Sequence, residues 1–482
     1  MRITDIEIKN FRAFYGEHRI PLHNAGKNLM VYGENGSGKS SLFLALKKFF
    51  ESSVSDVPIV HDENIFAPQN QQGNGYIRLS LKENPNDAQR IVYELSPNNE
   101  RLTGPNVVDI ADANKIKGFF DYKNLLQTHF IDLHRARVNL FDILIRNILY
   151  HAINQFTNDE IGSQWEEIHK YTHKYRQGSN IVSWIKEELT KFNDGLNVLL
   201  TEIKEDANTF MSEFDPNVRV SFDYNGVQYQ GRRHLSNQEL SLNIDYCNQR
   251  VDKHQYFLNE ARLSALAISL YLASIRVNPT GGTLKVLVLD DLLIGLDMSN
   301  RLPLLKILKD HFEGGFQIIM TTYDRMWFEV VRNQFGQENW NYVEIYSNKL
   351  KEEDFEIPVI NDHSGFLNRA KDHLAANDFK ASAVYIRTEF ERLVKKYCAE
   401  KRLKVTYKKN LKELQSNELW ESIVDQTNIS EELKNDIETH RGTVMNPYSH
   451  YDLERPQFKA ELEATIDSVE LLQNEFASIR RV

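Results

Sequence analysis

A glycine-rich run that ends in lysine and serine carries the clearest chemistry in this sequence. Residues 33–40 read GENGSGKS and match the phosphate-binding pattern G-x-x-x-x-G-K-[ST]. Glycines let successive backbone N–H groups point into one concave nest, and a following helix adds its positive N-terminal end. Lys39 is therefore predicted to reach the β- and γ-phosphates of a nucleotide, and Ser40 to ligate Mg²⁺. The predicted phosphate-binding residues are Gly33, Asn35, Gly36, Ser37, Gly38, Lys39, Ser40 and Ser41.

The residues on either side of this run support the match. Leu29–Tyr32 is a short apolar run typical of a buried strand, and Ser41–Phe50 has the apolar content of a helix. An accidental glycine-rich turn is the alternative, and such a turn would lack both flanking elements. The sequence therefore predicts a strand, a phosphate-binding loop and a helix in that order.

Two aspartates at the end of another apolar run supply the acidic half of such a site. Val286–Leu289 predicts a buried parallel strand, and Asp290 follows it, 250 residues after Ser40. Asp290 is predicted to hold Mg²⁺, and Asp291 to polarise the attacking water as a catalytic residue beside Lys39. The alternative is a core strand that ends in two solvated aspartates.

The composition limits the class of protein. A chain of 482 residues suggests two to four domains. With 41% hydrophobic and 26% charged residues it reads as a soluble globular protein, and two distant cysteines, Cys247 and Cys398, predict a reducing, cytoplasmic location. No apolar run approaches the roughly 18 residues of a membrane span. The net charge of −10 argues against a uniformly basic nucleic-acid surface, although a local basic groove stays compatible with it.

The wide separation of the two motifs resembles the ABC-type ATPases of the SMC, RecF and RecN group, whose head is split by an insertion. Ile6–Phe14 looks like their first strand and turn, Gly295–Asp297 resembles their D-loop, and Thr321–Asp324 lies where they carry a switch histidine. The resemblance implies ATP and Mg²⁺ as ligands, and heads that pair into homo-oligomers around ATP. It also implies a Q-loop glutamine that contacts nucleotide and Mg²⁺, for which Gln127 is the candidate.

The same resemblance places a signature helix before the acidic strand. Asn259 would cap this helix and meet the γ-phosphate bound by the opposite head. Three departures from the family pattern suggest slow hydrolysis. Asn-Glu-Ala-Arg, beginning at Asn259, replaces Ser-Gly-Gly-Gln or Ser-Gly-Gly-Glu; Asp291 replaces a glutamate; and Tyr323 replaces the histidine that senses nucleotide. Arg262 is either a charge for the opposite phosphate or an arginine on the helix surface.

The expected fold class is α/β: a P-loop ABC-type ATPase head, split by a short helical or coiled-coil insertion and followed by an all-α bundle. The expected domains are the first head lobe (1–135), the helical insertion with a β-hairpin (136–234), the second head lobe (235–357) and the bundle (366–482). An apolar stripe from Ile181 to Ile203 predicts a helix, either a short coiled coil or a packed core helix. Val218–Tyr229, with Asn225-Gly226 inside it, predicts a β-hairpin, and Pro358–Gly365 predicts a linker.

The C-terminal part resembles HEPN-like helical bundles, some of which are metal-independent ribonucleases that use an arginine and a histidine. Arg441 and His450 would be that pair, but they lie nine residues apart with Pro447 between them. A structural or partner-docking bundle is the other interpretation. A basic stretch, Lys395–Lys412, would meet phosphates or an acidic protein, or form a solvated helix face.

With its short arm and helical C-terminal bundle, the chain resembles the AriA-like ATPases of the PARIS anti-phage system and, to a lesser extent, the PtuA-like ATPases of Septu. This resemblance implies an oligomeric ATPase that restrains a toxic nuclease effector until it senses a phage trigger protein, often a DNA mimic. Two alternatives stay open: a RecF- or SMC-like repair ATPase that binds DNA, and a toxin whose ATPase controls a HEPN-like ribonuclease. No membrane partner is expected.

Overall fold

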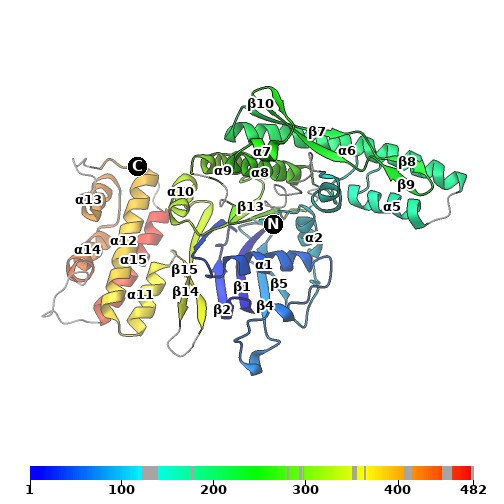
Figure 1. The fold of residues 1–482 in the computed structure, drawn as a ribbon. Helices are drawn as coiled ribbons and strands as arrows, with labels where there is room; N and C mark the ends of the chain where they lie inside the picture. Colours follow the sequence, from blue (N-terminus) through cyan, green and yellow to red (C-terminus); the bar gives the residue numbers. More distant parts are fainter. Residues whose placement is uncertain are drawn as a thin grey trace. The chain divides into compact units, whose positions relative to one another are not determined.

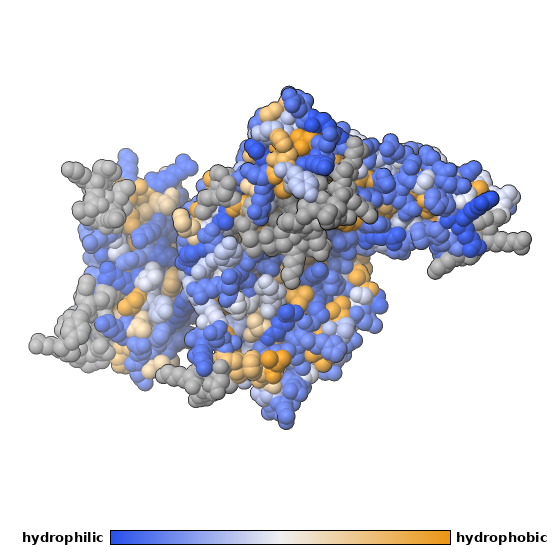
Figure 2. Space-filling view, viewed as in Figure 1, coloured by the Kyte–Doolittle hydropathy of each residue, from blue (hydrophilic) through white to orange (hydrophobic). Residues whose placement is uncertain are grey.

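The computed structural model describes residues 1–121, 139–174, 178–278, 282–292, 296, 298–349, 355–362, 365–405, 415–447 and 459–478. They form two compact units, Met1–Asn361 and Asp362–Val482 (Figure 1). Hydrophilic side chains cover most of the face seen in Figure 2, as expected for a chain with 26% charged residues. None of the described helices combines the length and the apolar character that a membrane crossing needs.

The first unit is built around a six-stranded sheet in the order β15-β14-β3-β13-β12-β6. The strands from β14 to β6 run parallel to one another. Every residue of β3, β12 and β13 is buried, which is why each strand has an apolar run at its centre. The bounds are β3 Asn28–Gly33, β6 Phe119–Asp121, β12 Val286–Asp290, β13 Gln317–Thr322, β14 Trp340–Lys349 and β15 Glu356–Asp362.

The central strands send alternate side chains into two different cores. Leu29 and Val31 of β3 pack into the core that includes α1 (Lys39–Glu51), whereas Met30 and Tyr32 pack into the core that includes α8 (Glu260–Val277). This alternation follows from the two-residue repeat of a strand. Both faces of the sheet are therefore covered. The loop between β3 and α1 lies at the carboxyl ends of the parallel strands.

An antiparallel sheet in the order β2-β1-β4-β5 closes the core around α1. The expected first strand and turn are β1 and its connection to β2. The remaining elements of this lobe are two short 3-10 turns and one helix. The bounds are β1 Arg2–Phe11, β2 Phe14–Pro21, η1 Val60–Asp62, η2 Gln69–Gln71, β4 Tyr76–Lys82, β5 Ile91–Leu95 and α2 Val107–Lys115.

A helical insertion follows β6 and contains the long helix α6 (Ser179–Phe214). The apolar stripe predicted from Ile181 to Ile203 lies on α6, and its residues from Ile185 onward are buried. α6 packs against α5 and α8, so the packed-core interpretation holds and the stripe faces its own chain. The other helical elements here are α4 Phe141–Ile143, η3 Leu144–Ile148 and α5 Ile161–Lys174.

The β-hairpin predicted over Val218–Tyr229 is wrong. β7 pairs with β10, while β8 pairs with β9. Asn193 of α6 explains the difference, because its side-chain oxygen accepts hydrogen bonds from the Tyr224 hydroxyl and from the Val227 N–H at 2.9 Å. The turn between these residues is thereby tied to the helix. The bounds are β7 Val218–Tyr224, β8 Gln228–Gly231, β9 His234–Ser236, β10 Leu240–Tyr246 and β11 Gln249–Val251.

The linker predicted from Pro358 onward is also partly wrong, because Pro358 lies inside β15. β15 is an edge strand, and an edge strand tolerates a residue without an N–H. The first unit is completed by α7 His254–Phe257, α9 Met298–His311 and α10 Arg325–Phe335.

The second unit is helical and has its own core, which includes Phe390, Trp420 and Ile437. Its elements are α11 Phe366–Ala375, α12 Phe379–Lys401, α13 Ser416–Gln426, α14 Glu431–His440, the π-helical turn η6 Arg441–Met445 and α15 Lys459–Ser478. Arg441 begins η6, where its guanidinium lies over the Phe390 ring and donates to Asn417 at 2.8 Å. His450 lies outside the described residues. The mixed α/β head with a helical C-terminal region confirms the predicted fold class.

Candidate functional site

The predicted phosphate-binding loop connects β3 to α1 and turns sharply over the sheet edge. Gly38 has φ +107°, a backbone conformation that side chains with a Cβ rarely adopt. A Cβ on Gly33 would meet the Ser37 hydroxyl at 2.3 Å and the Ile345 carbonyl at 2.9 Å. The Ser37 hydroxyl is buried and has no hydrogen-bond partner among the described residues. The loop is thus packed too tightly for larger residues at either glycine.

Lys39 is the first residue of α1, and its ammonium lies across the mouth of this loop. The Nζ atom donates to the carbonyl oxygens of Gly33 at 2.6 Å and Glu34 at 3.0 Å. Burial lowers the pKa of Lys39, while the nearby Asp291 and Asp290 oppose that shift. Two backbone carbonyl oxygens therefore hold the positive charge of Lys39 next to the predicted phosphate-binding loop.

Asp290 ends β12 beside the exposed Ser40. The Ser40 hydroxyl donates to Asp290 Oδ2 at 3.2 Å, and the Thr321 hydroxyl donates to Asp290 Oδ1 at 2.5 Å. Burial raises the pKa of Asp290, and these two hydrogen bonds counteract part of that effect. The structure therefore brings together the two predicted Mg²⁺ ligands, which lie 250 positions apart in the chain.

Thr321 and Asp121 are neighbours of Asp290 that the sequence did not reveal. In the parallel register, Asp290 lies opposite Thr321 on β13 and opposite Asp121 on β6. The negative charge of Asp121 contributes to the raised pKa of Asp290. Asp121 is the last residue of β6 and Thr321 the second-last residue of β13, and this was the signal in the sequence. It becomes visible only once the order of the strands is known.

Asp291 adopts a left-handed backbone with φ +51°. Its Oδ1 accepts the Tyr323 N–H at 3.1 Å, and its Oδ2 lies 3.9 Å from the Lys39 ammonium. Burial raises the pKa of Asp291, while Lys39 opposes the shift. Asp and Asn are the residues besides glycine that best tolerate this conformation. The Asp291 carboxylate is thereby held beside the phosphate-binding loop, between the Lys39 ammonium and the Tyr323 N–H.

The N-terminal half of the chain matches a known protein family. The family described as AAA ATPase domain, AAA_15, matches residues 1–259 of the 482. The chain belongs to this family. No curated protein matches this AAA ATPase.

Solved SMC head structures align with this AAA ATPase at low identity. The SmcHead bound to the C-winged helix domain of ScpA is 13% identical with a TM-score of 0.42, over 75% of this chain and 99% of that chain. The Pyrococcus furiosus Smc head with an extended coiled coil, bound to the C-terminal domain of ScpA, is 13% identical with a TM-score of 0.44, over 78% and 99%. The SMC head domain from Thermotoga maritima is 16% identical with a TM-score of 0.36, over 76% and 100%.

The residues of this AAA ATPase suit a nucleotide with Mg²⁺. The unpartnered Ser37 hydroxyl and the tight glycines make a cradle of backbone and hydroxyl groups, and the Lys39 ammonium lies at its mouth. Ser40 and Asp290 would hold Mg²⁺, which is commonly bound through one carboxylate together with substrate phosphates. The ion would supply positive charge to the phosphate oxygens.

Other residues predicted for this site lie apart from its centre. Asn35 is exposed on the loop. The Ser41 hydroxyl accepts the Ala13 N–H at 3.4 Å, so it faces the β1–β2 turn. Tyr323 reaches Asp291 through its backbone, and its side chain is 42% exposed. Gln127, Gly295 and Asp297 lie outside the described residues.

Asn259 caps α8 as the sequence suggested. Its side-chain oxygen accepts the Arg262 N–H at 3.0 Å. Arg262 itself donates to Asp215 at 2.7 Å and lies over the Tyr246 ring, so the structure favours the helix-surface interpretation of this arginine. Among the described residues, no hydrogen bond or ion pair joins Asn259 to the phosphate-binding loop, Asp290 or Asp291.

Asp290→Asn is expected to stabilise the nucleotide-free ATPase at neutral pH. Since burial raises the pKa of Asp290, its ionised form is less stable in the fold than in the unfolded chain. The advantage of asparagine should shrink as the pH falls through that raised pKa, because the wild-type carboxyl then becomes protonated. Urea unfolding of both proteins without Mg²⁺, between about pH 5 and pH 8, measures the difference.

Asp324→Asn is the matched control at the same sheet edge. Burial alone would raise the pKa of Asp324, but the hydrogen bond from Arg301 lowers it overall. This variant should therefore lose stability at neutral pH, and the loss should persist down to about pH 5, because the lowered pKa of Asp324 lies below that range. If both variants lose stability in the same way, the burial of Asp290 is compensated by its partners and the prediction is wrong.

Proposed function

We propose that this protein is an ATP-hydrolysing ABC-type switch whose heads pair around ATP. The proposal rests on two groups of residues that would each contact the nucleotide but that lie apart on one chain; we call each group a half-site. Lys39, Ser40 and Asp290 form one half at the sheet edge. The exposed, capped start of α8 at Asn259 forms the other, and no described hydrogen bond or ion pair joins it to the first half. A second head supplies what the first lacks.

Exposed apolar side chains border both half-sites. Tyr323, whose N–H donates to Asp291, is 42% exposed, and Met326 on the following helix is 71% exposed. Tyr256 and Phe257, just before Asn259, are 60% and 58% exposed. Aromatic residues and methionine are enriched where protein surfaces meet. Their placement supports burial of these two regions when heads pair.

Slow turnover is part of the proposal. Asp291 has a shorter side chain than glutamate, and it is already engaged by the Tyr323 N–H and lies near Lys39. A general base must lie within hydrogen-bond reach of the proton it abstracts. The short, engaged carboxylate supports a low hydrolysis rate, which suits a switch whose ATP-bound state must last.

Asn259→Asp tests the completion of the site by a second head. Aspartate caps a helix as well as asparagine does, so stability should be unchanged. Its charge would repel a γ-phosphate, and ATP turnover should fall about tenfold or more. Thermal unfolding and steady-state phosphate release measure the two effects. Unchanged turnover would mean that Asn259 does not face the nucleotide.

Mixing variants separates completion by a second head from a simple loss of function. Equal amounts of Asn259→Asp and Lys39→Ala protein form mixed pairs in which one of two sites has both intact halves. With random pairing, half of the pairs are mixed, so the mixture should recover about one quarter of wild-type turnover per head. No recovery in the mixture would place both half-sites on one chain.

In the cell, we propose that this switch restrains a nuclease effector and releases it on contact with a phage trigger protein, including DNA mimics. The resemblance to AriA-like ATPases supports this role, and head pairing gives it a physical means. Co-expression with a nuclease encoded beside it should arrest growth only when the trigger is present and Lys39 is intact. Direct, ATP-dependent binding of DNA by the purified protein would instead favour the repair alternative.

A further inference from the structure

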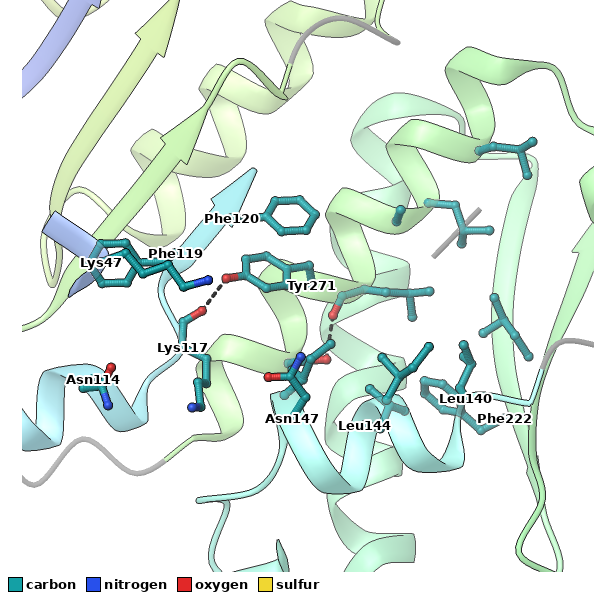
Figure 3. A pocket seen from close by; sticks show the side chains of 18 of the residues that line it. Lys47, Asn114, Lys117, Phe119, Phe120, Leu140, Leu144, Asn147, Phe222 and Tyr271 are labelled. Carbon is teal, nitrogen blue, oxygen red and sulfur yellow. Dashed lines mark hydrogen bonds between the residues drawn. The ribbon is translucent and has the colours of Figure 1, made fainter. Parts of the chain in front are cut away.

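A cavity of about 240 Å³ lies in the first unit, at the opposite end of α1 from the phosphate-binding loop. Its walls come from α1, from the end of α2 and β6, from α4 with η3, from β7 and β10, from His254 of α7 and from α8. Figure 3 shows most of these lining residues. Within the ranges that the structure describes, none of the residues placed at the nucleotide site lines it. It is therefore a separate feature of the fold.

One end of the cavity is apolar. Leu140 and Leu144 lie beside Phe222 in Figure 3, and Leu266 and Ala267 of α8 also line the wall. Such a wall favours an apolar body through the hydrophobic effect. The volume lies just below the usual range of ligand pockets, so it suits only a small molecule.

The other end is polar and positively charged. Lys47, Asn114 and Lys117 lie together there in Figure 3. Within the described part of the chain, neither lysine ammonium lies within ion-pair distance of a carboxylate, although Glu51 also lines the cavity. The Asn114 side chain likewise makes no hydrogen bond to any described residue. Donors without partners at the end of an apolar cavity are groups that a ligand would satisfy.

Lys117 is held in place by its backbone. It adopts φ +60°, and its carbonyl oxygen accepts the hydroxyl of the buried Tyr271 (dashed in Figure 3). A lysine in this left-handed conformation is strained, and glycine or asparagine would largely avoid that strain. Burial lowers the pKa of Lys117, while Glu51 opposes the shift. A strained lysine with a partly buried charge is unfavourable for the empty fold, and a bound anion would offset that cost.

We propose that this cavity binds a small amphipathic anion. Its apolar body lies against Leu140, Leu144 and Phe222, and its charged group lies between Lys47 and Lys117. Among the described residues that line the cavity, two lysines stand against one carboxylate, Glu51, so the lining complements one negative charge. Glu160, outside that lining, also attracts Lys117. A carboxylate or a phosphate monoester satisfies the same chemistry.

Calorimetric titration of the full-length, nucleotide-free protein with sodium octanoate tests the proposal. Octanoate should bind at one site, with a dissociation constant on the order of 1 mM or tighter. Octylammonium has the same apolar body with the opposite charge, and it should bind at least about tenfold more weakly. Octyl phosphate in place of octanoate distinguishes a phosphate monoester from a carboxylate as the preferred head group.

Lys117→Asn should weaken octanoate binding about tenfold or more, while it retains a residue suited to the left-handed backbone. Arg232→Asn is the matched control, because Arg232 is an exposed cation with φ +49° that does not line the cavity. Ala267→Leu should fill the cavity and abolish binding. If the Ala267→Leu variant fails to fold, octanoate binding by Lys117→Asn still tests the proposal. Absence of octanoate binding, equal binding of octylammonium, or unchanged binding by Lys117→Asn would overturn the proposal.

Discussion

Lys39→Ala is expected to weaken ATP binding by roughly two orders of magnitude. The ammonium lies at the mouth of the loop, held by the Gly33 and Glu34 carbonyl oxygens. Bound phosphates would replace neutral carbonyls as its partners, and charge-assisted hydrogen bonds are worth about 1.5–3 kcal/mol each. Calorimetric titration with a non-hydrolysable ATP analogue measures the loss directly.

Lys48→Ala provides the control for the Lys39 experiment. Lys48 lies on the same helix and pairs with Asp62 at 2.6 Å, away from the loop. This variant should bind ATP like the wild type, which separates the role of Lys39 from a general effect on α1. Thermal unfolding of both variants checks that the fold is intact. Equal affinity of Lys39→Ala and wild type would show that the nucleotide binds elsewhere.

Asp291→Asn is expected to slow hydrolysis by about 10²–10³-fold while it leaves ATP affinity nearly unchanged. Asparagine tolerates the φ of +51° at this position, and its side-chain oxygen can still accept the Tyr323 N–H. The substitution therefore removes the basic carboxylate with little change in geometry. Single-turnover phosphate release and nucleotide binding measure the two quantities separately.

The same variant should accumulate as paired heads in ATP and Mg²⁺. Light scattering after size-exclusion chromatography should show about twice the single-chain mass with ATP, and the lower mass with ADP. An Asp291→Asn protein that stays at one mass in both nucleotides would argue against heads that close on ATP. Wild-type turnover by this variant would remove Asp291 from the catalytic role.

The elements around the phosphate-binding loop could be predicted because their signals are local. Leu29–Tyr32 and Val286–Leu289 are short apolar runs bounded by glycine or aspartate, and both are fully buried parallel strands. The capping role of Asn259 was also a local inference, and the structure bears it out. Local chemistry thus identified which residues belong to the site region, while their catalytic roles stay predictions.

The environment of Asp290 could not be predicted, because it depends on which strands become neighbours. Thr321 and Asp121 approach Asp290 only through the order β13-β12-β6. The Asn225-Gly226 hairpin failed for the same reason: a contact with Asn193 on a distant helix decided the pairing. Pro358 suggested a linker, yet an edge strand accommodates it. Tertiary contacts overrode the local signals in each case.

The position of β3 in the sheet has a consequence for synthesis on the ribosome. Its neighbours are β13 and β14, whose residues paired with Leu29, Ile319 and Asn341, come 290 and 312 positions later. At about 5–20 residues per second, this strand waits roughly 15–60 s for its partners. During that interval a strand that is fully buried in the finished fold has no sheet to join, so the nascent chain should depend on holdase chaperones. A chain released early, before β14, would lack the strand that pairs with β3 as far as Gly33, the first residue of the phosphate-binding loop.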